Sequence, residues 1–186
     1  KFKFKKIMPE EHDLIYSLMP FDNPFCHPTI MFHKNILRYV GNYNQSNNFS
    51  EDYELWSRIL IKYKAQNLNK FLLNYNMSSN QISNKINKFK IEELYSIQKK
   101  FFETNNFILN SNLSFLHKQL IYVSSFTDNY KSNYTLFLRK FVFIKKIFKM
   151  NIEKKTFEYV SFNKVLLIIL FNISLYYSKY GLKILF

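Results

Sequence analysis

From about residue 85 to the C-terminus, apolar residues recur three and four positions apart. This spacing places them on one face of an α-helix. The pattern predicts four helices, over residues 86–107, 113–125, 134–150 and 157–185, the last broken near Gly181. No internal repeat and no linker rich in Pro, Gly or Ser divides the chain. We therefore place the one domain boundary at 83–85, which gives regions 1–84 and 85–186.

The N-terminal region has a mixed pattern. Alternating or continuous apolar residues predict short strands at 1–6, 29–32 and 71–77. Helical spacing predicts helices at 9–19, 35–40 and 51–65, with Pro9 in the first turn of one and Gly41 ending another. The sequence therefore predicts an α/β region at 1–84, followed by a mainly α-helical region at 85–186.

Residues 23–58 hold the strongest candidate for chemistry, the adjacent carboxylates Glu51 and Asp52. The predicted helix begins at this pair, where free backbone N–H groups and the helix dipole stabilise negative charge. An ionised, fixed carboxylate suits a general base. The alternative is that the pair does no more than cap the helix.

Cysteine and histidine usage bounds the other chemistries. With Cys26 as the single cysteine, no internal disulfide can form. Its neighbour His27 would point away from it in an extended segment, so we do not expect a catalytic thiol. The four histidines show no metal-ligand spacing with the cysteine, so no metal site is predicted.

The net charge of +14 suggests an anionic partner, although a biased base composition of the gene would also raise it. Residues 131–186 carry 11 of the 27 basic residues and 2 of the 13 acidic ones. Because these basic residues alternate with large aliphatic ones, we expect no nucleic-acid partner. The apolar run at 165–178 is shorter than the ~20 residues that span a bilayer. It is either a helix lying on an anionic membrane surface or a helix packed in a bundle.

Several motifs follow one another in a characteristic order: HPTIMF at 27–32, VGNY at 40–43 and EDYELWSR at 51–58. Related residues extend the series upstream to about residue 4 and downstream to about 85. This series resembles the acceptor half of the inverting family 2 glycosyltransferases of the GT-A fold, in particular bacterial enzymes of capsule, exopolysaccharide and O-chain synthesis.

The resemblance implies a function. A sugar would pass from a nucleotide sugar to a glycan or lipid-linked acceptor, with Asp52 as general base and Glu51 orienting the acceptor. It also implies substrate contacts from three residues: His27, Thr29 and Trp56. Trp56 could instead belong to the core, and His27 could instead bind a loop carbonyl.

The donor half of such an enzyme is not recognisable. Enzymes of this family hold Mg²⁺ or Mn²⁺ with an Asp-x-Asp motif, which this sequence lacks. The Arg and His that often follow Tyr75 in the family are also missing. We therefore expect a donor-binding partner chain or a longer protein, in the cytoplasm or peripheral on the inner face of the membrane. The alternative is a non-catalytic, membrane-associated subunit or a decayed fragment of such an enzyme.

Overall fold

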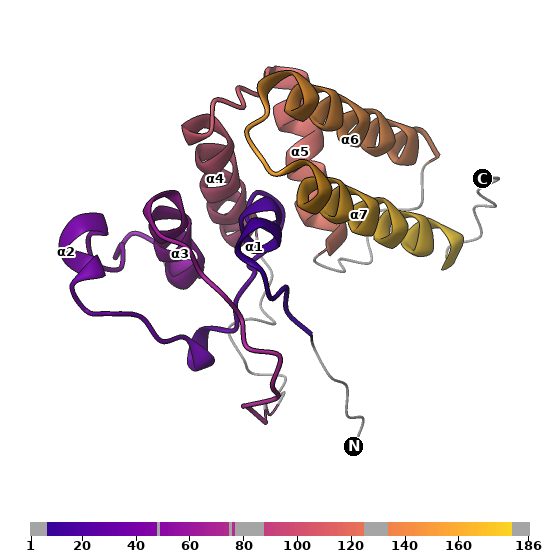
Figure 1. Ribbon diagram of the computed structural model, residues 1–186. Coiled ribbons are helices and arrows are strands. Elements are labelled where there is room, and N and C mark those ends of the chain that lie inside the picture. The colour runs from indigo at the N-terminus through magenta and orange to yellow at the C-terminus, as the bar shows by residue number, and fades with distance from the viewer. Residues whose placement is uncertain (1–6, 48, 75, 77–87, 125–133, 180–186) are drawn as a thin grey trace.

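The computed structural model describes residues 7–47, 49–74, 76, 88–124 and 134–179 (Figure 1). Its helices, in chain order, are α1 (His12–Leu18), the 3₁₀ turn η1 (His27–Thr29), α2 (Ile36–Val40), α3 (Glu51–Lys62), α4 (Lys88–Thr104), α5 (Ser111–Ser124), α6 (Tyr134–Lys154) and α7 (Tyr159–Lys179). Three predicted features lie outside the described residues: the strand at 1–6, the boundary at 83–85 and the break near Gly181.

The predicted α/β fold is wrong for the part of the chain that the structure describes, which contains no β-strand. Residues 29–32 begin in the turn η1 and then run extended from Ile30 (φ −77°, ψ 138°) without pairing. Residues 71–74 also lie outside any helix or strand. An extended segment becomes a strand only when a neighbouring segment pairs with its N–H and C=O groups. The described residues supply no such neighbour, so the acceptor half of a GT-A fold is not what forms.

The seven predicted α-helices all occur, with some ends shifted by a few residues. α1 begins at His12, so Pro9 precedes the helix and does not occupy its first turn as predicted. α3 ends at Lys62, earlier than predicted, because Tyr63 turns to an extended backbone (φ −133°, ψ 148°). Helical periodicity was therefore a reliable guide along the whole described chain.

The helices pack in chain order and then close back on the beginning of the chain (Figure 1). α2 packs on α3, α3 on α4, α4 on α5, α5 on α6, and α6 on α7. α7 then packs against α1, although more than 140 positions separate them in the sequence. This closing contact brings the C-terminal helices against α1, which precedes the candidate site in the chain.

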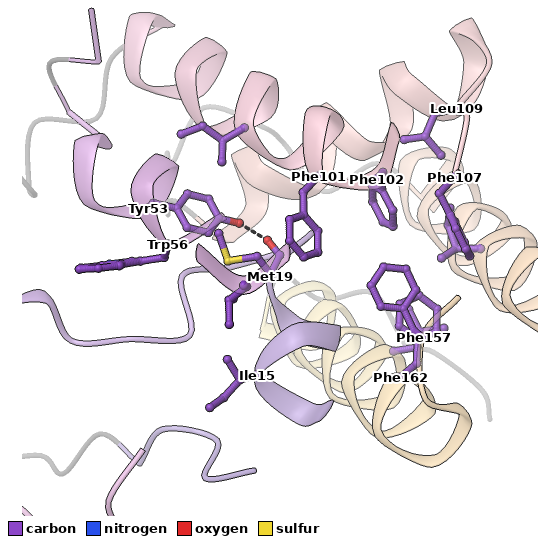
Figure 2. Close-up of a cluster of buried hydrophobic side chains, with 14 of the residues drawn as sticks. Ile15, Met19, Tyr53, Trp56, Phe101, Phe102, Phe107, Leu109, Phe157 and Phe162 are labelled. Carbon is purple, nitrogen blue, oxygen red and sulfur yellow. Dashed lines mark hydrogen bonds between the residues drawn. The ribbon is translucent and has the colours of Figure 1, made fainter. Parts of the chain in front are cut away.

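Aromatic side chains fill the junction between these helices (Figure 2). The rings of Phe157 and Phe162 stack with their centroids 4.6 Å apart, and Phe102 stacks on Phe107 at 5.6 Å. Nearer α3, the buried Tyr53 hydroxyl donates a hydrogen bond to the Met19 carbonyl (Figure 2). This bond satisfies the one polar group of a large buried side chain, which would otherwise be costly to bury.

α6 and α7 form the last pair of helices and lie side by side (Figure 1). A short connection joins them, and Asn151 near the end of α6 fixes its residue Phe157 by two hydrogen bonds of 2.9 and 3.1 Å. Among the described helices, none combines the length and the apolar character needed to cross a bilayer.

Candidate functional site

Asp52 stands in the first turn of α3, and its carboxylate is held from two sides. The backbone N–H of Tyr53 donates to Oδ1 at 2.7 Å, and the side-chain amide of Asn23 donates to Oδ2 at 3.1 Å. The side chain is 19% exposed, so solvent still reaches it. The carboxylate therefore has a fixed orientation and an open side, as a general base requires.

His27 lies between Asp52 and Tyr43. Its Nδ1 is 3.9 Å from Asp52 Oδ2, and its Nε2 is 3.2 Å from the Tyr43 hydroxyl. We assign the ring proton to Nδ1, facing the carboxylate, because Nε2 can then accept the hydrogen bond from the Tyr43 hydroxyl. The hydrogen-bond partner of His27 is therefore a side-chain hydroxyl and not the loop carbonyl that the alternative prediction named.

Tyr43 is the residue to which sequence analysis assigned no role. Partial burial raises the pKa of its hydroxyl, and the negative charges of Asp52 and Glu51 raise this pKa further. The hydroxyl therefore stays protonated at neutral pH and can donate to His27. The available signal was its position in the VGNY motif, two residues after the helix-ending Gly41.

Trp56 is 3% exposed and belongs to the hydrophobic core, as the alternative prediction for it stated. Its ring meets those of Phe25 and Phe32 edge-on, and that of His27 with centroids 5.9 Å apart. The buried indole therefore packs against the imidazole edge-on. Close packing of this kind restricts the rotamers of the otherwise half-exposed histidine.

The two remaining predicted residues lie at the edge of this group. Thr29 is exposed, and its hydroxyl donates to the Cys26 carbonyl at 2.8 Å, which closes the η1 turn. Glu51 is half-buried at the start of α3, near enough to Tyr43 for its charge to raise the tyrosine pKa. The structure thus brings Asp52, His27 and Trp56 together and adds Asn23 and Tyr43 to them.

Arg58 fixes the loop that carries Tyr43. Its guanidinium binds Glu54, one turn earlier in α3, through two hydrogen bonds of 2.9 and 2.7 Å. The two residues stand four positions apart in the helix, a spacing that brings opposite charges together on one face. The other N–H groups donate to the carbonyls of Val40, Gly41 (3.2 Å) and Asn42 (2.8 Å). A planar five-donor group can bind a carboxylate and a helix end at once, which an ammonium cannot do.

Gly41 makes this arrangement possible. It ends α2 with φ +83° and ψ 168°, a backbone conformation nearly restricted to glycine. A Cβ atom added there would lie 3.3 Å from Arg58 Nη1. The predicted helix-ending role of Gly41 is confirmed. The structure adds a reason for glycine at this position, because a Cβ atom would be strained at this φ and would crowd the Arg58 side chain.

An open hollow of about 330 Å³ lies between α3, α4 and the loop that follows Tyr43. Polar side chains line much of it, including Asn44, Glu54 and Glu93. None of the predicted site residues lines this hollow, so the candidate site is the separate group around Asp52.

A divalent cation would need several oxygen or nitrogen ligands close together. In the part of the chain that the structure describes, no three His, Cys, Asp or Glu side chains gather in that way. Together with the missing Asp-x-Asp motif, the donor set does not fit the Mg²⁺ or Mn²⁺ that the resemblance implies. We therefore derive no step through a metal ion.

Comparisons with known proteins give one informative match. The chain is 39% identical over 80 residues to an O-antigen biosynthesis glycosyltransferase, WbnJ, of Escherichia coli. The match covers 39% of this chain and 30% of that protein, so the chain spans less than a third of its relative's length. No protein-family profile and no solved structure matches the chain. Part of the chain is therefore similar to a glycosyltransferase of O-antigen biosynthesis.

Proposed function

We propose that this chain contributes the acceptor side of a glycosyltransferase with Asp52 as its general base. The reaction would transfer a sugar from a nucleotide sugar to a glycan or lipid-linked acceptor in cell-surface polysaccharide synthesis. The observation that carries the proposal is the geometry around Asp52. A carboxylate fixed by Tyr53 N–H and Asn23 stands 3.9 Å from His27 Nδ1, and the other ring nitrogen of His27 meets the Tyr43 hydroxyl. The partial similarity to an O-antigen biosynthesis glycosyltransferase supports the same chemistry.

The proposed step is an inverting displacement like that of the family 2 enzymes that the motifs at 27–58 resemble. Asp52 takes the proton of an acceptor hydroxyl while that oxygen attacks the anomeric carbon of the donor sugar. The bond to the nucleotide diphosphate breaks on the opposite face, and the diphosphate leaves with the bonding electron pair. The base must lie within hydrogen-bond reach of the hydroxyl, either directly or through one water.

Each neighbour of Asp52 has a part in this step. Asn23 and the Tyr53 N–H keep one orientation of the carboxylate. The proton on His27 Nδ1 faces the carboxylate and stabilises its negative charge before transfer. The Tyr43 hydroxyl, half exposed at the rim, is placed to accept a hydrogen bond from the acceptor sugar. The donor nucleotide would be bound by a partner chain or by another part of a longer protein.

The test is transfer by the full-length protein, together with any donor-binding partner, using a panel of UDP-, GDP- and dTDP-sugars. Loss of a general base lowers the rate by about 10²–10⁴-fold. We expect Asp52→Asn to lower kcat by that amount while nucleotide-sugar binding, measured by calorimetry, stays unchanged. The matched control is Asp13→Asn, an exposed carboxylate on α1.

Two outcomes would contradict the proposal. Full transfer activity in Asp52→Asn would favour a non-catalytic subunit instead. Equal loss of activity in the Asp13→Asn control would show that the effect is one of folding and not of catalysis.

A further inference from the structure

α6 turns one side toward α5 and α7 and the other side outward. The buried side is continuous over three turns of the helix: Lys140, Phe143, Ile144, Ile147 and Asn151. The outward side carries large apolar residues that are 41–47% exposed: Leu138, Phe141, Val142 and Ile152. Four basic residues stand among them on the same side: Arg139, Lys145, Lys146 and Lys149. The outward face of a helix in a water-soluble protein is normally polar, whereas this one mixes basic residues with large exposed apolar ones.

The outward side of α7 is even more apolar. Four of its residues, spaced to fall on one face of a helix, are 55–65% exposed: Val160, Leu167, Ile168 and Phe171. Lys164 is the one charged residue among them. α7 uses its opposite side to pack on α1 and α6, so the exposed face is not available to the described core.

The two exposed sides belong to neighbouring helices joined by a short connection (Figure 1), and we call them together the α6–α7 face. The buried side of α6 packs toward α5 and α7, and the buried side of α7 packs toward α1 and α6. The face therefore combines eight exposed apolar side chains with five basic ones. Glu153 is the acidic residue on the outward side of α6, and it pairs with Lys149 at 3.8 Å.

We propose that the α6–α7 face binds the surface of an anionic lipid membrane, with both helices lying in the plane of the headgroups. The charge is complementary, because basic residues outnumber acidic ones on the face and each adds attraction to anionic headgroups. The arrangement is also suitable, because a lysine can extend its ammonium to the headgroups while neighbouring apolar side chains enter the acyl boundary.

A protein partner fits this face less well. Cores of protein–protein interfaces are depleted in lysine and enriched in aromatic residues. Here Lys145, Lys146 and Lys164 stand among the apolar residues, where a protein interface would bury their charges. This inference goes beyond glycosyl transfer and does not depend on it.

Flotation of the full chain with lipid vesicles tests the proposal. One set of vesicles is pure phosphatidylcholine, and the other contains 30% phosphatidylglycerol. We expect binding to the anionic set and at least 10-fold weaker binding to the neutral set. Binding to neither set would overturn the proposal. The proposal would also be overturned if light scattering showed a stable dimer without lipid and the substitutions Leu167→Gln and Phe171→Gln dissociated that dimer.

Two variants locate the binding surface. The triple variant Lys145→Gln, Lys146→Gln, Lys149→Gln should lower the affinity for anionic vesicles by roughly 100-fold, because each basic residue contributes about fivefold. Leu167→Gln with Phe171→Gln should lower binding to both vesicle sets. All five positions are exposed and should tolerate polar residues, and an unchanged circular dichroism spectrum confirms that each variant folds.

Matched controls lie at the opposite end of the chain. Lys34→Gln, Lys64→Gln, Lys70→Gln removes the same charge from exposed positions outside the face. Met31→Gln with Leu72→Gln removes two exposed apolar side chains outside the face. Vesicle binding that falls as much in these controls as in the α6–α7 variants would reject this face as the binding surface.

Discussion

The Nε2 atom of His27 lies 3.2 Å from the hydroxyl oxygen of Tyr43, sixteen positions further along the chain. This contact joins the η1 turn to the loop after Gly41, and it directs the other ring nitrogen of His27 toward Asp52. A carboxylate can only accept a hydrogen bond, so the tautomer with the proton on Nδ1 suits both neighbours of the ring, because the Tyr43 hydroxyl can then donate to Nε2. Three of the following four predictions test this part of the chain.

Tyr43→Phe removes the hydroxyl and keeps the ring. We expect kcat/KM for transfer to fall about 10-fold, because a hydrogen bond of this kind contributes up to about 1.5 kcal/mol. The free energy of unfolding should change little, since the side chain is exposed. Tyr39→Phe is the control, because Tyr39 is also exposed and lies outside the site. Equal activity of the Tyr43→Phe variant and the unmodified protein would rule out a positioning role for this hydroxyl.

Trp56 is the single tryptophan, so its fluorescence reports on the His27 ring that it touches. We expect His27→Gln to change the emission of Trp56 at neutral pH, because the edge-to-face contact between the two rings is lost. His33→Gln, which removes an exposed histidine outside the site, should leave the emission unchanged. An unchanged emission in His27→Gln would show that the two rings are not in contact in solution.

Gly41→Ala forces a Cβ atom into a conformation at φ +83° and places it 3.3 Å from Arg58 Nη1. A non-glycine residue in this backbone region costs about 1–3 kcal/mol. Denaturant unfolding should show a loss of that size in the free energy of unfolding. Gln45→Ala, an exposed change in the same loop, should stay within about 0.5 kcal/mol of the parent. If both variants unfolded at the same denaturant concentration, the positive φ at position 41 would not be needed for the fold.

His117 makes stability depend on pH. It is fully buried among aromatic rings, its Nε2 binds the Pro20 carbonyl, and burial lowers its pKa to about 4. The unfolded chain, with an ordinary histidine pKa, binds the proton first as the pH falls. The free energy of unfolding should therefore drop by roughly 2 kcal/mol between pH 7 and pH 5, and further until about pH 4.

Comparison of variants isolates this effect. His117→Phe cannot take up a proton in the unfolded chain, so its stability should lose that part of the pH dependence. At pH 7 it should still be less stable by about 1–3 kcal/mol, because the Pro20 carbonyl loses its partner. His33→Gln should keep the full dependence. An unchanged slope in His117→Phe would assign the acid sensitivity to other groups.

The sequence determined the features that depend on neighbours along the chain. The periodicity that predicts α3 through α7, the glycine that ends α2 and the Glu54–Arg58 pair all act within about one helical turn. Helical hydrogen bonds close between residues four apart, so local sequence holds enough information to place them. The position of Asp52 in the first turn of its helix was predictable for the same reason.

The tertiary structure decided the features that depend on residues far apart. Segments 29–32 and 71–77 read as strands, but a strand also needs a partner, and local sequence does not say whether one exists. Packing of α7 on α1, the Asn23 amide on Asp52 and the Tyr43 hydroxyl on His27 each join distant positions. The same packing decided which side of α7 stays exposed. Because α7 carries apolar residues on every side, its own sequence does not say which side will be buried, and the positions of its neighbours decide this.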